Sequence, residues 1–229
     1  MNVRPELVCA NLADIERRIT DACSRAGRET SPRLLVASKY LDVEQMGILV
    51  QAGIGLVGEN RAEGLEGKWA RWNGSFEFHF IGHLQSRKAR QVVPCVSLIH
   101  SVESISLVEE LDKRAETGEI RVLLEVNVSG EETKYGILPA AAETFLERAA
   151  AHRRVKFTGL MTMAPFTPDL ESTRPYFREL RELRDRLAVA FTGRYELTEL
   201  SMGMSNDYEV AVEEGATIVR IGSALLSDA

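Results

Sequence analysis

A lysine follows an apolar run near the start of the chain. The segment LLVA at 34–37 is typical of a strand buried on both faces, and Ser38 and Lys39 come directly after it. We therefore expect Lys39 at the carboxyl end of a strand. A primary amine placed there can form a Schiff base with an aldehyde. The alternative is a solvated lysine that begins a loop.

Polar residues and glycines also follow most of the other apolar runs. They include Glu59, Asn60, Gly82, His83, Asn127, Ser129, the segment SMGMSND at 201–207, Gly222 and Ser223. Where parallel strands close into a barrel, their carboxyl ends carry the active site, and the loops after the last two strands commonly bind phosphate. Glycine backbone N–H groups and serine hydroxyls suit such an anion. These residues indicate a ligand site.

Arg220 lies within an apolar strand segment, VRIGS at 219–223. A buried guanidinium is costly unless it meets an acceptor, so Arg220 requires a partner inside the fold. A primary amine, a phosphate-binding loop and a buried arginine together suit a phosphorylated aldehyde held as a Schiff base.

The elements that position these residues alternate between short strands and helices. Eight strands are predicted, at 33–38, 54–57, 76–81, 96–100, 121–128, 156–161, 197–201 and 217–221. Helical spacing predicts helices at 6–26, 42–53, 59–72, 105–115, 177–187 and 207–214, with Asp42 and Gln45 as a capping box. Eight strands and a leading helix favour a single-domain (β/α)₈ TIM barrel over 1–229. A doubly wound open sheet is the alternative.

Two further motifs have weaker interpretations. Gly53, Gly55 and Gly58 form a G-x-G-x-x-G pattern, but they close a helix and span a strand, the reverse of a dinucleotide site. His79 and His83 are four residues apart on a predicted strand, which separates them by about 13 Å, too far to share a metal ion. His83, at the strand end, is a candidate ligand contact.

Composition excludes several classes of protein. The 229 residues carry a net charge of −6, which argues against binding nucleic acid. No apolar run is long enough to span a membrane, and the N-terminus does not resemble a signal peptide. Cys9, Cys23 and Cys95 are far apart and are expected as small buried residues in a reducing cytoplasm. A monomer is favoured.

The motifs together resemble those of the pyridoxal phosphate homeostasis proteins, relatives of the N-terminal barrel of alanine racemase. The resemblance runs through almost the whole chain. It rests on ASK at 37–39, GEN at 58–60, HFIGHLQSRK at 79–88, VNVSGEETKYG at 126–136, GLM at 159–161, LSMGMSND at 200–207 and VRIGS at 219–223. The chain departs from the family pattern at Tyr40, at Leu41-Asp42 and at Leu226-Ser227, beside the expected site.

The resemblance implies pyridoxal 5'-phosphate bound to Lys39 as a Schiff base, with Arg220 near the pyridine nitrogen. It also implies that Asn60 and His83 line the ring. The phosphate contacts it implies come from Ser201, Met202, Gly203, Ser205, Gly222 and Ser223. Lys134 is either a transient carrier of the cofactor or a solvated loop lysine.

The implied function is intracellular balance of vitamin B6, with little or no catalysis and with apo-enzymes as possible recipients of the cofactor. An arginine keeps the pyridine nitrogen neutral, which suppresses most amino-acid chemistry of the cofactor. Racemisation also needs a second base, which related racemases take from another domain of a partner subunit, although Tyr40 could substitute. A small racemase or lyase is therefore the alternative. A purely structural or interaction protein leaves the polar strand ends unexplained.

Overall fold

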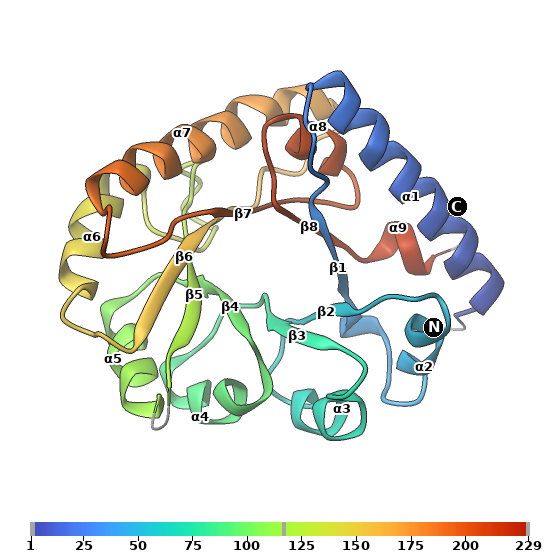
Figure 1. The fold of residues 1–229 in the computed structure, drawn as a ribbon, viewed down its shortest axis with the longest axis horizontal. Coiled ribbons are helices and arrows are strands. Elements are labelled where there is room, and N and C mark those ends of the chain that lie inside the picture. The colour runs from blue at the N-terminus through green and yellow to red at the C-terminus, as the bar shows by residue number, and fades with distance from the viewer. Residues whose placement is uncertain (1–2, 116–117, 228–229) are drawn as a thin grey trace.

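Eight parallel strands close into a barrel in chain order in the computed structural model, which describes residues 3–115 and 118–227 (Figure 1). The strands are β1 (Arg33–Ala37), β2 (Leu56–Glu59), β3 (Glu77–Phe80), β4 (Leu98–Val102), β5 (Ile120–Glu125), β6 (Val155–Met161), β7 (Glu199–Met204) and β8 (Ile218–Ile221). β1 pairs with both β2 and β8, so the sheet has no edge. This confirms the barrel and excludes the open sheet.

Helices form a layer around the strands (Figure 1). They are α1 (Pro5–Arg25), α2 (Met46–Gln51), α3 (Leu65–Trp72), α4 (Ala89–Val92), α5 (Ile105–Arg114), α6 (Ala142–Ala149), α7 (Arg174–Ala190), α8 (Tyr208–Glu213) and α9 (Ser223–Leu226). The leading helix α1 packs against α8 and α9 on the outside of the barrel. Short 3₁₀ turns are η1 (Ser38–Tyr40), η2 (Ser86–Lys88), η3 (Val93–Cys95), η4 (Pro139–Ala141) and η5 (Leu170–Thr173).

The predicted capping box precedes α2. The Gln45 backbone N–H donates to Asp42 Oδ1 at 2.8 Å, and the Asp42 backbone N–H donates to Gln45 Oε1 at 3.0 Å. Gly53 follows the helix with φ of +77°, a conformation that favours glycine. The G-x-G-x-x-G pattern therefore ends a helix and enters a strand, as the sequence indicated.

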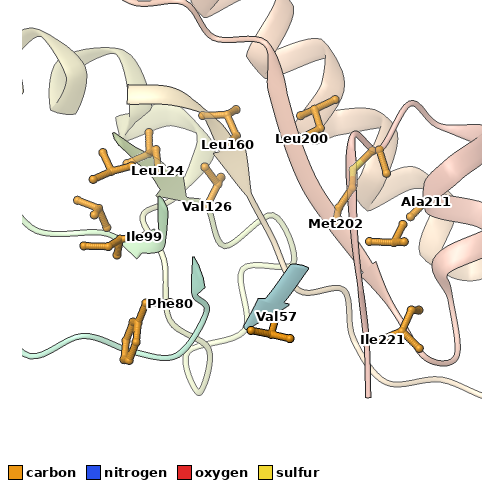
Figure 2. Packing of buried hydrophobic residues seen from close by; sticks show 14 of the residues in the cluster. Val57, Phe80, Ile99, Leu124, Val126, Leu160, Leu200, Met202, Ala211 and Ile221 are labelled. Atoms are coloured by element: carbon orange, nitrogen blue, oxygen red, sulfur yellow. The ribbon is translucent and has the colours of Figure 1, made fainter. Parts of the chain in front are cut away.

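Alternation along the strands divides the core into two layers. Strand residues of one parity face the helices and belong to the larger outer layer, part of which is shown in Figure 2. Residues of the other parity fill the barrel interior. The apolar ones are Leu35, Leu56, Leu98, Leu123, Met161 and Ile218. The interior is therefore a packed core, as in other barrels of this type.

The predictions were wrong in several places. β2 ends two residues later than predicted, at Glu59, and the helix expected over 59–72 begins only at Leu65, because Gly64 before it adopts φ of +85°. β7 continues to Met204 instead of ending at residue 201. α4, α6 and α9 were not predicted. Cys9 is exposed, not buried, since it lies off the apolar stripe of α1.

No helix within residues 3–115 and 118–227 is both long and apolar enough to cross a membrane.

Truncation of a barrel-interior side chain should destabilise the fold. Leu123 is fully buried, so Leu123→Ala is expected to lower the free energy of unfolding in urea by about 2–5 kcal/mol through lost burial and a residual cavity. Val189, 78% exposed on α7, offers the control: Val189→Ala should change it by less than about 0.5 kcal/mol. Equal effects of the two substitutions would contradict the packed interior.

Candidate functional site

A cavity of about 420 Å³ lies at the carboxyl ends of the strands. Its walls come from the ends of β1, β5, β7 and β8 and from the segments that follow most of the strands. They include Ala37, Lys39, Tyr40, Asn60, Gly82, His83, Glu125, Tyr135, Phe166, Ser205, Asp207, Arg220, Gly222 and Ser223. This position and size are typical of a small-molecule site in a barrel of this type.

Lys39 lies on the 3₁₀ turn η1 directly after β1, and its Nζ is 4.8 Å from the centre of the Tyr40 ring. Buried hydrogen bonds of Ser38 hold this turn in place. The buried Ser38 hydroxyl donates to Glu59 Oε1 at 2.6 Å, and Lys68 Nζ donates to the Ser38 carbonyl oxygen at 2.9 Å. Lys68 also pairs with Glu59 Oε1 at 2.6 Å. This buried ion pair fixes the backbone from which Lys39 projects.

Arg220 points from β8 into the barrel and is 5% exposed. Its Nη1 donates to Ser201 Oγ at 2.6 Å, and its Nη2 donates to the Thr162 carbonyl oxygen at 2.9 Å. Burial lowers the pKa of Arg220 to about 10, against the opposing effect of the carboxylates of Asp207 and Glu125. The side chain therefore remains a cation at neutral pH. The acceptors that it was predicted to need are the Ser201 hydroxyl and the Thr162 carbonyl oxygen.

The loops after β7 and β8 are joined through Ser205. Its Oγ accepts hydrogen bonds from the backbone N–H groups of Gly222 at 3.1 Å and Ala224 at 3.2 Å. Within the first loop, Asp207 Oδ1 accepts the Met204 N–H at 2.6 Å. Because β7, β8 and β1 are neighbours in the barrel, these loops lie on the same side of the cavity as Lys39.

Three of the predicted phosphate contacts do not line this cavity. Ser201 is fully buried inside the barrel, where its hydroxyl contacts Arg220 and His100. Met202 points the opposite way into the outer core, near Ala211 of α8 (Figure 2). Gly203 adopts φ of +88°, and a Cβ there would lie 2.5 Å from the Ala211 Cβ. The cause is the extension of β7, which makes residues 202–204 part of the strand instead of a loop.

His79 and His83 point to different places. His79 is fully buried in the barrel interior, whereas His83 lies at the mouth of the cavity. His83 Nδ1 is 3.0 Å from Glu103 Oε1, and its ring stacks on Tyr135 with centroids 4.1 Å apart. Within the described residues, no three His, Cys, Asp or Glu side chains are grouped to hold a metal ion.

Lys134 lies beside the cavity and not on its lining. Its Nζ pairs with Glu131 Oε1 at 3.1 Å, and about a fifth of its side chain is exposed. Burial raises the pKa of Asp207, which does line the cavity, and the charge of Lys134 opposes that shift slightly.

Glu125 is the functional candidate that sequence reasoning missed. It ends β5 inside the barrel, it lines the cavity, and its Oε2 is buried without a hydrogen-bond partner. Burial raises the pKa of Glu125 to about 7, assisted by the nearby carboxylate of Glu103 and opposed by Arg220. A charge within the apolar segment 120–126 is the same signal that marked Arg220. The contribution of Lys68 to the turn of Lys39 had no such signal, because α3 is amphipathic.

The site thus defines a small-molecule-binding barrel whose mouth combines an amine, a buried guanidinium and two joined loops with serine hydroxyls. The comparisons with known proteins agree. The family model of the alanine racemase N-terminal domain matches residues 59–229. A pyridoxal phosphate homeostasis protein of Aquifex aeolicus is 44% identical over 224 residues, which span 96% of this chain and 97% of the relative.

A human protein of the same name is 31% identical, with 96% of this chain and 86% of the relative covered. The structure of PipY from Synechococcus elongatus with PLP bound is 30% identical, with a TM-score of 0.83, and covers 96% of this chain and 100% of PipY. The chain belongs to the alanine racemase N-terminal domain family and, within it, to the pyridoxal phosphate homeostasis proteins.

Loss of the ion pair beneath Lys39 should be costly. Lys68→Met leaves the Glu59 carboxylate buried without its counter-charge, so the free energy of unfolding is expected to fall by about 3–5 kcal/mol. Adding Glu59→Gln removes that charge and should recover part of the loss. Urea denaturation of both single variants and the double variant completes the cycle. Strict additivity would show that the pair is not coupled.

Glu125 should reduce stability as the pH rises. Between its ordinary pKa of 4.5 and about 7, the unfolded chain releases this proton while the folded chain retains it, so folding becomes less favourable. Glu125→Gln does not titrate. The free energy of unfolding of Glu125→Gln minus that of the wild type should therefore be about 3 kcal/mol larger above pH 7 than below pH 4.5. Unfolding curves across this range test the effect. Glu132→Gln, at an exposed position, is the control, and parallel curves for Glu125→Gln and the wild type would contradict it.

Proposed function

We propose that this protein binds pyridoxal 5'-phosphate as a Schiff base on Lys39 and carries it for intracellular vitamin B6 balance, with little or no catalysis. The observation that carries this proposal is the convergence of Lys39, Arg220 and the joined loops at Ser205 and Gly222 on one cavity. The names of the relatives and the PLP bound to PipY support it.

The residues present fit the cofactor chemically. Lys39 offers an amine for the aldehyde. Ser205 and Ser223 offer hydroxyl donors for the phosphate, and Gly222 lets the backbone approach it closely. They follow β7 and β8, of which β8 pairs with β1. Arg220 offers a donor for the ring nitrogen. Asn60 and His83 then line the ring from the segments that follow β2 and β3. Ser201, Met202 and Gly203 lie on β7, directly before the loop that carries Ser205.

The charge of Arg220 supports carriage rather than catalysis. Bound pyridoxal phosphate supplies an electron sink, and that chemistry is strongest when its pyridine nitrogen is protonated. Arg220 is held in place by Ser201 and Thr162, and its pKa of about 10 keeps it a cation at neutral pH. A cationic donor facing the nitrogen keeps that nitrogen unprotonated. This chain therefore provides an amine that anchors the cofactor and an arginine that keeps its ring nitrogen unprotonated.

The cellular role follows from an anchored cofactor without strong turnover. We infer that the recipients are apo-enzymes that require the cofactor, and that the protein acts as a monomer in the cytoplasm. The net charge of −6 supports a monomer, and the free thiols of Cys9, Cys23 and Cys95 are consistent with a reducing compartment.

Borohydride reduction of the purified protein with pyridoxal phosphate, followed by peptide mass mapping, tests the anchor. The expected result is a pyridoxyl adduct on Lys39 that is absent in Lys39→Ala. Lys134→Ala is the matched control, because Lys134 lies near the cavity but does not line it, and it should retain the adduct on Lys39. An adduct spread over surface lysines, or none, would overturn the proposal.

Turnover assays on the same preparations separate the carrier from an enzyme. Racemase or transaminase activity at typical enzymatic rates, above about 1 per second, that is lost in Lys39→Ala would establish the alternative, a small racemase or lyase.

A further inference from the structure

A chain of buried hydrogen bonds runs through the barrel interior from Arg220 toward the amino end of the strands. Arg220 Nη1 donates to Ser201 Oγ at 2.6 Å, and Ser201 Oγ lies 2.9 Å from His100 Nδ1. His100 Nε2 lies 3.0 Å from His79 Nδ1, and His79 Nε2 lies 2.8 Å from Glu77 Oε1. Ser201, His100 and His79 are at most 1% exposed.

The two ends of the chain fix the direction of every bond. Glu77 is an acceptor because its hydrogen bond with His79 lowers its pKa to about 2, so His79 must carry its proton on Nε2. Burial lowers the pKa of His79 and His100, which keeps both rings neutral. Neutral His79 therefore accepts at Nδ1, and His100 must donate from Nε2.

The same reasoning reaches the other end. His100 accepts at Nδ1, so the Ser201 hydroxyl donates to it and presents its lone pairs to Arg220. Arginine has only donors, so its bond to Ser201 has the required direction. Each member of the chain is fully used, which also explains why Ser201 has no hydrogen left for an anion in the cavity.

We propose that His79 and His100 are positioning residues for Arg220: the chain anchored at Glu77 holds both imidazoles as their Nε2–H tautomers and keeps the Ser201 oxygen turned toward the guanidinium. The chain does not deliver protons to the cavity, because Arg220 has no lone pair with which to accept one. It fixes the orientation of the guanidinium in the cavity wall, through side chains that are buried from solvent.

The tautomers are measurable without any ligand. In the protein with nitrogen-labelled histidine, long-range proton–nitrogen correlation spectra near neutral pH should show His79 and His100 each protonated at Nε2 alone. His83 and His152, both outside the barrel interior, serve as internal references. An Nδ1–H tautomer of His100, or a cationic ring at either interior position, would overturn the proposal.

Glu77→Gln tests whether the far end sets the direction. The Gln amide donates as well as accepts, so it no longer requires a proton on Nε2 of His79. Both histidines should then become mixtures of the Nδ1–H and Nε2–H tautomers. Two controls separate this from local damage. Ser97→Ala removes another donor to Glu77 Oε1, and Arg33→Gln removes the ion pair to Glu77 Oε2; both should leave the tautomers unchanged. Mixed tautomers in the controls, or unmixed ones in Glu77→Gln, would contradict the assignment.

The effect on the cavity rests on the proposed function and has its own measurement. Loss of a fixed donor at Arg220 should weaken binding of pyridoxal phosphate in Glu77→Gln by about three- to tenfold and change the absorption spectrum of the bound cofactor, with Lys39 still modified by borohydride. Unaltered affinity and spectrum would overturn the positioning role. If the wild type binds no pyridoxal phosphate, the proposed function fails, while the tautomers still test the chain.

Discussion

The buried charge of Arg220 is the constraint around which the polar interior of this barrel is organised. A guanidinium removed from water is stable only where acceptors replace its hydration. Ser201 and the Thr162 carbonyl oxygen provide them, and Thr162 is itself held by a bond from its hydroxyl to the Val126 carbonyl oxygen at 2.7 Å. The interior thus contains both apolar and polar side chains. An apolar cluster fills part of it, and a connected set of polar side chains supports the cavity. Replacing one member leaves its neighbour unsatisfied, which makes the set more demanding than an apolar core.

The closed topology explains why Lys39 and this arginine line the same cavity. Lys39 follows β1 and Arg220 lies on β8, so the two are separated by nearly the whole chain, yet β1 and β8 are paired and Leu35 is in register with Arg220. The loop after β7 enters from the next strand. Closure therefore places the three parts of the site, the amine, the cation and the serine-bearing loops, on one arc of the barrel mouth. Glu125 at the end of β5 lines another part of the cavity wall, and its Oε2 is buried without a hydrogen-bond partner.

Under the proposed function, the electrostatics of the site favour retention of the cofactor over its transformation. An arginine opposite a basic ring nitrogen stabilises the neutral form of that nitrogen, whereas strong electron withdrawal requires the protonated form. The lysine, by contrast, is exposed at the mouth of the cavity, on a turn held rigidly by Ser38, Glu59 and Lys68. An accessible amine on a fixed support suits binding and release of a small aldehyde.

Local patterns in the sequence determined the strand count, the leading helix and the position of Lys39 at a strand end, because apolar runs and capping residues act over a few neighbours. They favoured a barrel over an open sheet, but the pairing of β1 with β8 decided the closure. They also indicated that Arg220 needs a partner, since a charge in an apolar strand is costly wherever the strand lies. Only the tertiary structure decided that this partner is Ser201 together with the Thr162 carbonyl oxygen. The length of β7 turned Ser201 inward and Met202 outward, because one residue of strand reverses the face of a side chain. The meeting of Ser201 with His100, of His100 with His79, and of Lys68 with Glu59 depends on the register and packing of separate strands and helices, which no local pattern contains.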